Sequence, residues 1–188
     1  MTVGSDTLTF TYDASGRPLS VTLNGTTYYY VTNLQGDVTA ILNSSGTAVV
    51  TYTYDAWGNP LATTGDLATT LGTLNPLRYR GYVYDTETEL YYLQSRYYDS
   101  EVGRFINADV YASTGQGLLG NNMFAYCLNN PVFRIDIGGS ACVDCYDDDD
   151  YDINLIPGKD DVGPGGGNRY ITGGFPLVHT ILFLRVLI

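Results

Sequence analysis

The amino-acid sequence predicts an all-β fold, and three of its features support that prediction. The 188-residue chain contains 18 tyrosines, and tyrosine, like threonine, favours strands with a half-buried face. It also contains 22 glycines, which favour turns, and turn-forming segments recur through its first third. The length suits one domain with a substantial core, and we expect little helix.

Four turn segments divide residues 8–62. Each places Asp or Asn three residues before Gly: Asp13 and Gly16, Asn33 and Gly36, Asn43 and Gly46, Asp55 and Gly58. The Asp or Asn side chain accepts a hydrogen bond from the backbone two residues further on, and glycine adopts the positive φ that closes the turn. Successive turn glycines lie 20, 10 and 12 residues apart, which suits hairpins with strands of about 5–6 residues.

Strand-like segments fill the spaces between these turns. They cover residues 8–12, 19–23, 26–32, 38–42 and 48–54. We predict a β-meander of stacked β-hairpins, because one hairpin cannot bury its apolar face alone. The tyrosines are interpreted as packing residues that pair across strands, and an exposed carbohydrate-binding face of tyrosines is the alternative.

The rest of the chain alternates turns and loops. Residues 62–76 are small, polar and interrupted by Gly and Pro, so they are expected to form a loop. Two longer turns follow at residues 85–89 and 99–103. Residues 111–123 contain three glycines and are expected to form a surface loop, and residues 124–127 are expected to form a short strand or a helical turn.

The last part of the chain differs in character. Residues 147–150 are an acidic run, and they do not fit a calcium-binding EF-hand, because Ile153 and Lys159 occupy positions that require Gly and Glu. The apolar segment 175–188 is too short for a membrane span, which needs about 20 residues. We expect a poorly ordered C-terminal tail of low complexity over residues 141–188.

The charge of the chain restricts its partners. The formal net charge is −11, with net −5 over residues 1–135 and net −6 over the shorter segment 136–188. An acidic surface repels phosphate, so we expect no nucleic-acid partner and no anionic membrane partner.

Neither a metal site nor a cofactor site is expected. The three cysteines, Cys127, Cys142 and Cys145, include one CxxC motif, and a single such motif is weak evidence for zinc. His179 is the one histidine, and no local motif supports a Ser-His-Asp or Cys-His catalytic arrangement. The first residues have neither the basic start nor the apolar run of a secretory signal, and we interpret the chain as a piece of a longer protein.

Residues 78–136 contain several motifs in a fixed order. They are Tyr91-Tyr92, Arg96-Tyr97-Tyr98-Asp99, Gly103-Arg104-Phe105, Asp109, Phe124-Ala125-Tyr126, Asn129-Asn130-Pro131 and the closing Asp136. In this order they closely resemble the core domain at the end of bacterial Rhs (rearrangement hotspot) and YD-repeat proteins. Tyr12-Asp13 and Tyr54-Asp55 resemble the Tyr-Asp signature of the repeats. The resemblance also covers residues 10–62 and ends after Ser140.

This resemblance implies a domain organisation and a function. It implies repeats over residues 1–62, a linker over 63–77, the core domain over 78–140 and a variable tail over 141–188. In such proteins the repeats build a hollow β shell, the core plugs it, and a variable toxin or effector follows. The implied partners are the rest of the shell and that effector, and the implied location is extracellular or the cell surface.

Two other interpretations stay open. One is a cell-surface module that binds carbohydrate or protein through exposed tyrosines, and the other is a degenerate fragment with no independent function.

The family usually has Gly as the fifth residue of its first long turn, where this chain has Glu89, so we expect that turn to be less tight.

The resemblance also implies at most one catalytic activity, an aspartic-protease-like self-cleavage just after the core. Matched motif by motif, its residues are Arg96, Asp109 and Asp136. Two carboxylates that share a site do not both ionise easily, so one can polarise a carbonyl while the other activates water, and an arginine orients them. Ile137 and Ser140 depart from the family's closing motif, and a purely structural role for these residues, as turn formers, is the alternative.

Overall fold

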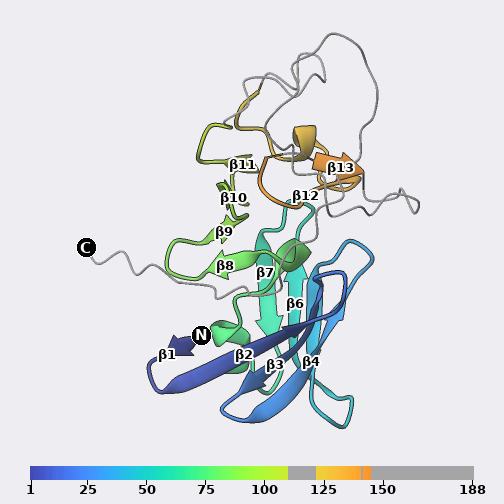
Figure 1. Ribbon diagram of the computed structural model, residues 1–188, viewed down its shortest axis with the longest axis vertical. Coiled ribbons are helices and arrows are strands. Elements are labelled where there is room, and N and C mark those ends of the chain that lie inside the picture. Colours follow the sequence, from blue (N-terminus) through green and yellow to red (C-terminus); the bar gives the residue numbers. More distant parts are fainter. Residues whose placement is uncertain (110–121, 141, 145–188) are drawn as a thin grey trace.

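The computed structural model describes residues 1–109, 122–140 and 142–144 and consists mostly of antiparallel strands (Figure 1). The expectations for the loop at 111–123 and for the tail fall largely outside these residues. The first sheet has seven strands in sequence order. They are β1 (Thr2–Val3), β2 (Asp6–Tyr12), β3 (Pro18–Leu23), β4 (Thr26–Thr32), β5 (Val38–Leu42), β6 (Ala48–Tyr54) and β7 (Pro60–Thr64). Five of these strands match the five expected segments to within two residues, and the predicted meander is confirmed.

Short elements follow the first sheet. They are the helix α1 (Leu71–Leu74), the 3₁₀ turn η1 (Tyr79–Gly81), β8 (Val83–Asp85), β9 (Leu90–Tyr92), β10 (Tyr97–Asp99), β11 (Arg104–Phe105), the 3₁₀ turn η3 (Cys127–Asn129), β12 (Arg134–Asp136) and β13 (Cys142–Asp144). Strands β8 to β11 form a second antiparallel sheet, and β12 pairs with β13. The expectation of a short strand or a helical turn over residues 124–127 is met only in part, because η3 begins at Cys127 and Ala125 forms an isolated β-bridge with Arg104.

The predicted turn chemistry is confirmed in all four repeat turns. In the first, Asp13 Oδ1 accepts hydrogen bonds from the backbone N–H groups of Ser15 and Arg17, both at 2.8 Å. The other three turns repeat this pattern. Their glycines all have positive φ values between 77° and 88°. In each turn, an Asp or Asn side chain accepts hydrogen bonds from the backbone two and four residues further on. These contacts are local in sequence, so each hairpin turn is determined locally.

The expectation of a loop over residues 62–76 is wrong in two places. Strand β7 continues to Thr64 and pairs with β6, where Thr63 lies opposite Tyr52. Helix α1 buries Leu71 completely against the first sheet. Asn75 is also fully buried, and its amide donates to the Leu77 carbonyl oxygen at 2.7 Å. The small, polar composition of this segment does not predict these contacts, because they depend on tertiary packing.

The turn at residues 85–89 is as tightly closed as its glycine-containing counterpart, which corrects the expectation for Glu89. The Glu89 N–H donates to the Asp85 carbonyl at 2.8 Å, and the Gly103 N–H donates to the Asp99 carbonyl at 2.9 Å. Glu89 adopts φ 60°, close to the φ 70° of Gly103. The substitution therefore leaves the turn geometry unchanged and places a residue with a Cβ in the left-handed region.

Replacing Glu89 with glycine should raise the free energy of unfolding by about 1 kcal/mol, because it removes the cost of a left-handed non-glycine residue. Chemical denaturation of both proteins measures the difference. The matched control is Glu87→Gly in the same turn, which relieves no positive φ and should be neutral or destabilising. A Glu89→Gly protein less stable than the parent would contradict the strain argument.

Two hydrophobic clusters meet at the boundary between the sheets. The first lies on one face of the seven-stranded sheet and includes Leu8, Val21, Ile41 and Val50. The second is largely aromatic and includes Tyr79, Tyr82, Tyr91, Tyr98, Phe105 and Tyr126. Tyr54 packs against both clusters, and its ring centroid lies 6.0 Å from that of Tyr79. The two sheets therefore share a continuous aromatic contact.

One repeat turn attaches the second sheet to the first through tyrosine hydroxyls. Tyr79 donates to the Ala56 carbonyl at 3.1 Å, Tyr98 to the Trp57 carbonyl at 2.7 Å and Tyr91 to the Gly58 carbonyl at 2.8 Å. A Cβ at residue 58 would lie 2.4 Å from the Tyr79 ring, so only glycine allows this approach. These buried tyrosines are packing residues with satisfied hydroxyls, as the favoured interpretation of the tyrosines predicts.

The buried tyrosines should make the fold sensitive to alkali. Burial raises the pKa of Tyr79 to about 12, and it raises the pKa values of Tyr91 and Tyr98 above the ordinary 10.0. Because their pKa values are higher in the folded state than in the unfolded state, these tyrosines contribute their full stabilisation below pH 10. That stabilisation is lost as the pH rises from 10 through the pKa values of the folded state. We expect cooperative unfolding above pH 10, with tyrosinate absorbance appearing together with loss of structure. Gradual ionisation of all tyrosines in a folded chain would contradict this expectation.

Candidate active site

The three residues that the sequence predicts as a site come from three separate segments. Arg96 lies in the tight turn between β9 and β10, where the Leu93 N–H donates to the Arg96 carbonyl at 3.0 Å. Asp109 follows β11, and Asp136 is the last residue of β12. The Asp109 N–H donates to the Met123 carbonyl at 2.9 Å, which holds the segment after β11 in place.

The structure brings these three side chains together. Arg96 Nη2 lies 3.0 Å from Asp109 Oδ2 and 3.4 Å from Asp136 Oδ2. The side chains are 7 %, 7 % and 3 % exposed, so water screens these ion pairs little. One guanidinium nitrogen thus links two buried carboxylates that are 27 residues apart in the sequence.

Every nitrogen of Arg96 has a partner in this site. Its Nη1 donates to the Met123 carbonyl at 3.0 Å, its Nε donates to the Gly139 carbonyl, and its guanidinium lies 3.6 Å from the centre of the Phe105 ring. Burial lowers the pKa of Arg96, and the carboxylates of Asp109 and Asp136 oppose that shift. A planar donor with this many fixed contacts holds its neighbours in one geometry.

Asp136 also organises the loop that follows it. Its Oδ1 accepts hydrogen bonds from the N–H groups of Gly139 at 2.7 Å and Ser140 at 3.0 Å. Its backbone carbonyl accepts a 2.6 Å hydrogen bond from the Tyr82 hydroxyl. The same carboxylate therefore contacts Arg96 through one oxygen and closes the loop through the other.

The residues that depart from the family's closing motif leave this loop intact. Ile137 is 40 % exposed and lies at the surface. Gly139 has φ 76°, and a Cβ there would lie 2.7 Å from the Leu93 carbonyl oxygen, so glycine is required. The essential features of the loop are the Asp136 carboxylate and the glycine, and both are present.

Sequence reasoning missed Ser95, which precedes Arg96 in the same turn. Its Oγ lies 2.7 Å from the carbonyl oxygens of both Gly138 and Gly139. Its backbone N–H also donates to the Gly138 carbonyl at 3.3 Å. No local sequence signal marks this contact, because its partners lie more than 40 residues further along the chain.

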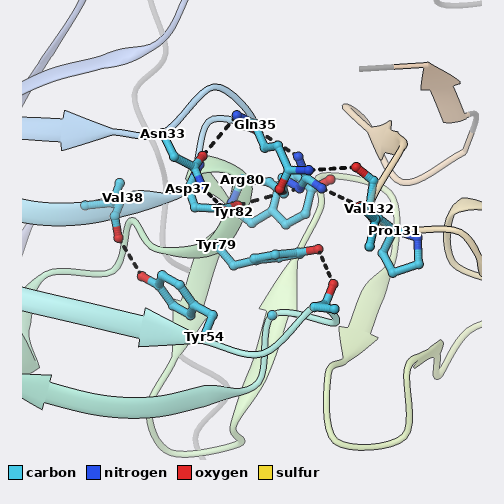
Figure 2. Close-up of polar contacts among 12 residues, drawn as sticks. Asn33, Gln35, Asp37, Val38, Tyr54, Tyr79, Arg80, Tyr82, Pro131 and Val132 are labelled. Carbon is cyan, nitrogen blue, oxygen red and sulfur yellow. Dashed lines mark hydrogen bonds and ion pairs between the residues drawn. The ribbon is translucent and has the colours of Figure 1, made fainter. Parts of the chain in front are cut away.

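Sequence reasoning also missed a buried network around Arg80 that links the first sheet to the segment before β12 (Figure 2). Arg80 donates through Nη1 to the Gln35 carbonyl and through Nη2 to the Pro131 carbonyl, and its Nε lies 3.6 Å from Asp37 Oδ1. Gln35 in turn donates to the Val132 carbonyl at 2.6 Å. The turn between β4 and β5 is thereby tied to the chain that leads to Asp136.

The described residues give no metal site. No group of three or more His, Cys, Asp or Glu side chains among them could hold a metal ion. Cys127 and Cys142 are free thiols, and burial raises the pKa of both. Cys145 and His179 lie outside the described residues. No helix in the described part of the chain is long and apolar enough to cross a membrane.

Few tyrosines in the described part of the chain are exposed. Within the described ranges, four are at least 40 % exposed: Tyr12, Tyr29, Tyr92 and Tyr97. Tyr92 and Tyr97 lie opposite each other on β9 and β10, with ring centroids 5.1 Å apart. Most of the tyrosine side chains in the described residues therefore pack against other parts of the fold.

Comparison with known proteins gives a consistent result. Residues 3–132 match the family model described as Teneurin YD-shell. The tRNA3(Ser)-specific nuclease WapA of Bacillus spizizenii is 45 % identical over 133 residues, which are 71 % of this chain and 6 % of that protein. The toxin protein Tse5 of Pseudomonas aeruginosa is 39 % identical over 64 residues, which are 34 % of this chain and 5 % of that protein.

A solved structure is similar over most of the chain. The crystal structure of TcdB2-TccC3-Cdc42 superposes with a TM-score of 0.62 and 26 % identity, covering 71 % of this chain and 6 % of that one. The chain thus spans about one twentieth of the length of these three proteins.

Proposed function

The chain belongs to the Teneurin YD-shell family, and from this membership we propose that it forms a segment of shell wall and the plug that closes the shell next to a C-terminal toxin or effector. Two relatives are named as a tRNA nuclease and a toxin, which supports the proposal that an effector follows the shell. The proposed partners are therefore the rest of the shell and the effector, and the proposed location is extracellular or the cell surface.

The seven-stranded sheet suits a piece of shell wall. Its strands follow one another in sequence order, with β1 and β7 at its two edges. An open edge leaves backbone N–H and C=O groups unpaired, and further hairpins of the same kind can pair with it. The proposed division is repeats over residues 1–62, a connection over 63–77, the core over 78–140 and the tail after it.

We further propose that the core cuts its own chain beside residue 140, with Arg96, Asp109 and Asp136 as the catalytic group. The observation that carries this proposal is that one buried arginine pairs with both carboxylates, while Asp136 also binds the segment to be cut. One carboxylate accepts a proton from the attacking water, and Arg96 holds both carboxylates in a fixed position. The bond is already tethered in place, so no substrate affinity is required.

Substituting either aspartate with asparagine should abolish this cleavage. Asparagine keeps the size of the side chain and removes the carboxylate that accepts the proton. The measurement is electrophoresis and mass spectrometry of the parent chain, Asp109→Asn and Asp136→Asn after identical expression. Asp66→Asn, in the segment between β7 and α1, is the control and should be cut like the parent. Equal cleavage of the parent and both site variants would refute an aspartyl mechanism.

A further inference from the structure

We infer that Cys127 and Cys142 are a redox pair that forms a disulfide in an oxidising environment. Both cysteines are free thiols in the structure, and the proposed hydrolysis uses neither of them. Extracellular and cell-surface proteins meet oxidising conditions, in which disulfides form and persist. The inference concerns these two thiols alone, and it holds whether or not the chain is cut.

The fold brings the two cysteines to one place from positions 15 residues apart in the sequence. Cys127 is the first residue of η3, which contacts β13 (Figure 1). Cys142 is the first residue of β13 and lies opposite Asp136 in the register of β12 and β13. Both cysteine side chains pack in the aromatic cluster that contains Tyr126 and Ile135. The two thiols therefore belong to one packed group of side chains.

The two thiols are close enough for one to influence the ionisation of the other. Burial is the main reason that the pKa of Cys127 is raised, and the neighbouring Cys142 thiol raises it further. A disulfide needs cysteine Cα atoms about 4.4–6.8 Å apart. Among the described strands β13 is paired with β12 alone, so it is free to adjust to that spacing.

The two cysteines can take different parts in the oxidation. The Cys142 side chain is only partly buried, and the neighbouring Arg134 opposes the rise in the pKa of Cys142 that burial causes. Cys142 therefore supplies the thiolate that attacks an external low-molecular-weight disulfide, such as oxidised glutathione. Cys127 is 1 % exposed, so it reacts second, within the protein.

The exchange balances in two steps. The sulfur of Cys142 bonds to one sulfur of oxidised glutathione, the sulfur–sulfur bond of glutathione breaks, and one glutathione leaves as a thiolate. Cys127 then loses its proton to solvent, its sulfur bonds to that of Cys142, and the second glutathione leaves as a thiolate. The two cysteines lose two electrons and two protons, and oxidised glutathione becomes two molecules of reduced glutathione.

The position of the disulfide has a consequence for the release of an effector, and this consequence alone rests on the proposed function. Cys127 and Cys142 lie on opposite sides of residue 140, so a chain cut there stays covalently linked while the disulfide is intact. Reduction then frees the downstream segment from the core. An effector whose target lies in a reducing cytosol is thereby released where it acts.

Peptide mapping of the full 188-residue chain tests the disulfide after oxidation with oxidised glutathione and alkylation of the remaining thiols. Trypsin cuts after Arg104, Arg134 and Lys159, so the two cysteines fall in separate peptides, 105–134 and 135–159. We expect these peptides to be joined, with a mass lower than their sum by two hydrogen atoms. Separate peptides from an oxidised, folded chain would overturn the inference.

Cysteine variants identify the partner of Cys127, because peptide 135–159 also contains Cys145. Cys145→Ser is the matched control and should leave the peptides joined, whereas Cys142→Ser should leave them separate. The opposite result, or a link only within peptide 135–159, would overturn the inference. Closure of this loop should also raise the thermal midpoint of the parent by about 5–10 °C on oxidation, a shift that Cys142→Ser should lose.

Electrophoresis of the oxidised chain with and without reductant tests the release. We expect two fragments that separate only after reduction. Fragments that separate without reductant, from a chain in which the disulfide has been mapped, would overturn the release and leave the disulfide standing. An uncut chain with joined peptides would overturn the proposed self-cleavage and the release that rests on it, but not the disulfide.

Discussion

Replacing Arg96 with methionine is expected to lower the free energy of unfolding by about 3–5 kcal/mol, because it removes the guanidinium that pairs with the buried carboxylates of Asp109 and Asp136. The carbonyls of Met123 and Gly139 lose their donor in the same change. The same variant should show no cleavage, since the two carboxylates lose the guanidinium that holds them together and the Gly139 carbonyl loses one donor. Urea unfolding and fragment analysis measure the two effects.

Arg96→Lys distinguishes the charge of Arg96 from its shape. Lysine keeps one positive charge, but its single ammonium cannot reach two carboxylates and two carbonyls with the fixed geometry of a guanidinium. We expect a smaller loss of stability than for methionine and still no cleavage. Arg104→Met on β11, where the arginine is exposed, is the matched control and should be near neutral. An Arg96→Met protein within 1 kcal/mol of the parent would show that the cluster contributes little.

Replacing Arg80 with methionine is expected to cost about 3 kcal/mol, for a related reason in a different place. Its side chain is 1 % exposed and pairs with Asp37, which is 9 % exposed and would stay buried without its cation. Asp37 would keep the backbone N–H of Arg80 at 3.0 Å and the Asn33 amide at 2.6 Å, so we place the loss at the lower end of the usual range.

A double-mutant cycle with Asp37→Asn measures the Arg80–Asp37 pair directly. Because the two side chains share one network, we expect the double variant to be more stable than the sum of the single losses predicts. Additive losses would mean that Arg80 acts through the carbonyls of Gln35 and Pro131 and not through the ion pair.

The hairpins of the first sheet were predictable because their signals are local. An Asp or Asn side chain and a glycine three residues later determine each repeat turn, as the hydrogen bonds of Asp13 and Asp55 confirm. The Asn24-Gly25 turn between β3 and β4 has positive φ at both residues and is another local signal, one that the prediction passed over.

The contacts between the sheets were not predictable in this way. The hydroxyls of Tyr79, Tyr91 and Tyr98 reach carbonyls 23 to 41 residues away in the sequence, and no spacing rule connects them. The helix around Leu71 was missed because it is short and lies in a segment of mostly small and polar residues, and its Leu71 is buried only by packing against the first sheet.

The residues of the candidate site also fall into two groups, those that could be selected before the structure was known and those that could not. Arg96, Asp109 and Asp136 were selected by resemblance to a family and not by any spacing in the chain, and the structure places them in contact. Ser95 and Arg80 could not be selected from the sequence, since their importance lies in carbonyl groups that they reach across the fold.

The intact mass of the purified parent chain tests the central claim, self-cleavage beside the Arg96 cluster, most directly. Hydrolysis predicts two fragments, the first ending next to residue 140, whose summed mass exceeds that of the uncut chain by one water molecule. Synthesis in water enriched in heavy oxygen should place one heavy atom in the new carboxylate of the first fragment. A single mass equal to that of the uncut chain, under conditions in which the chain is folded, would contradict self-cleavage and leave the Arg96 cluster as a structural element of the plug.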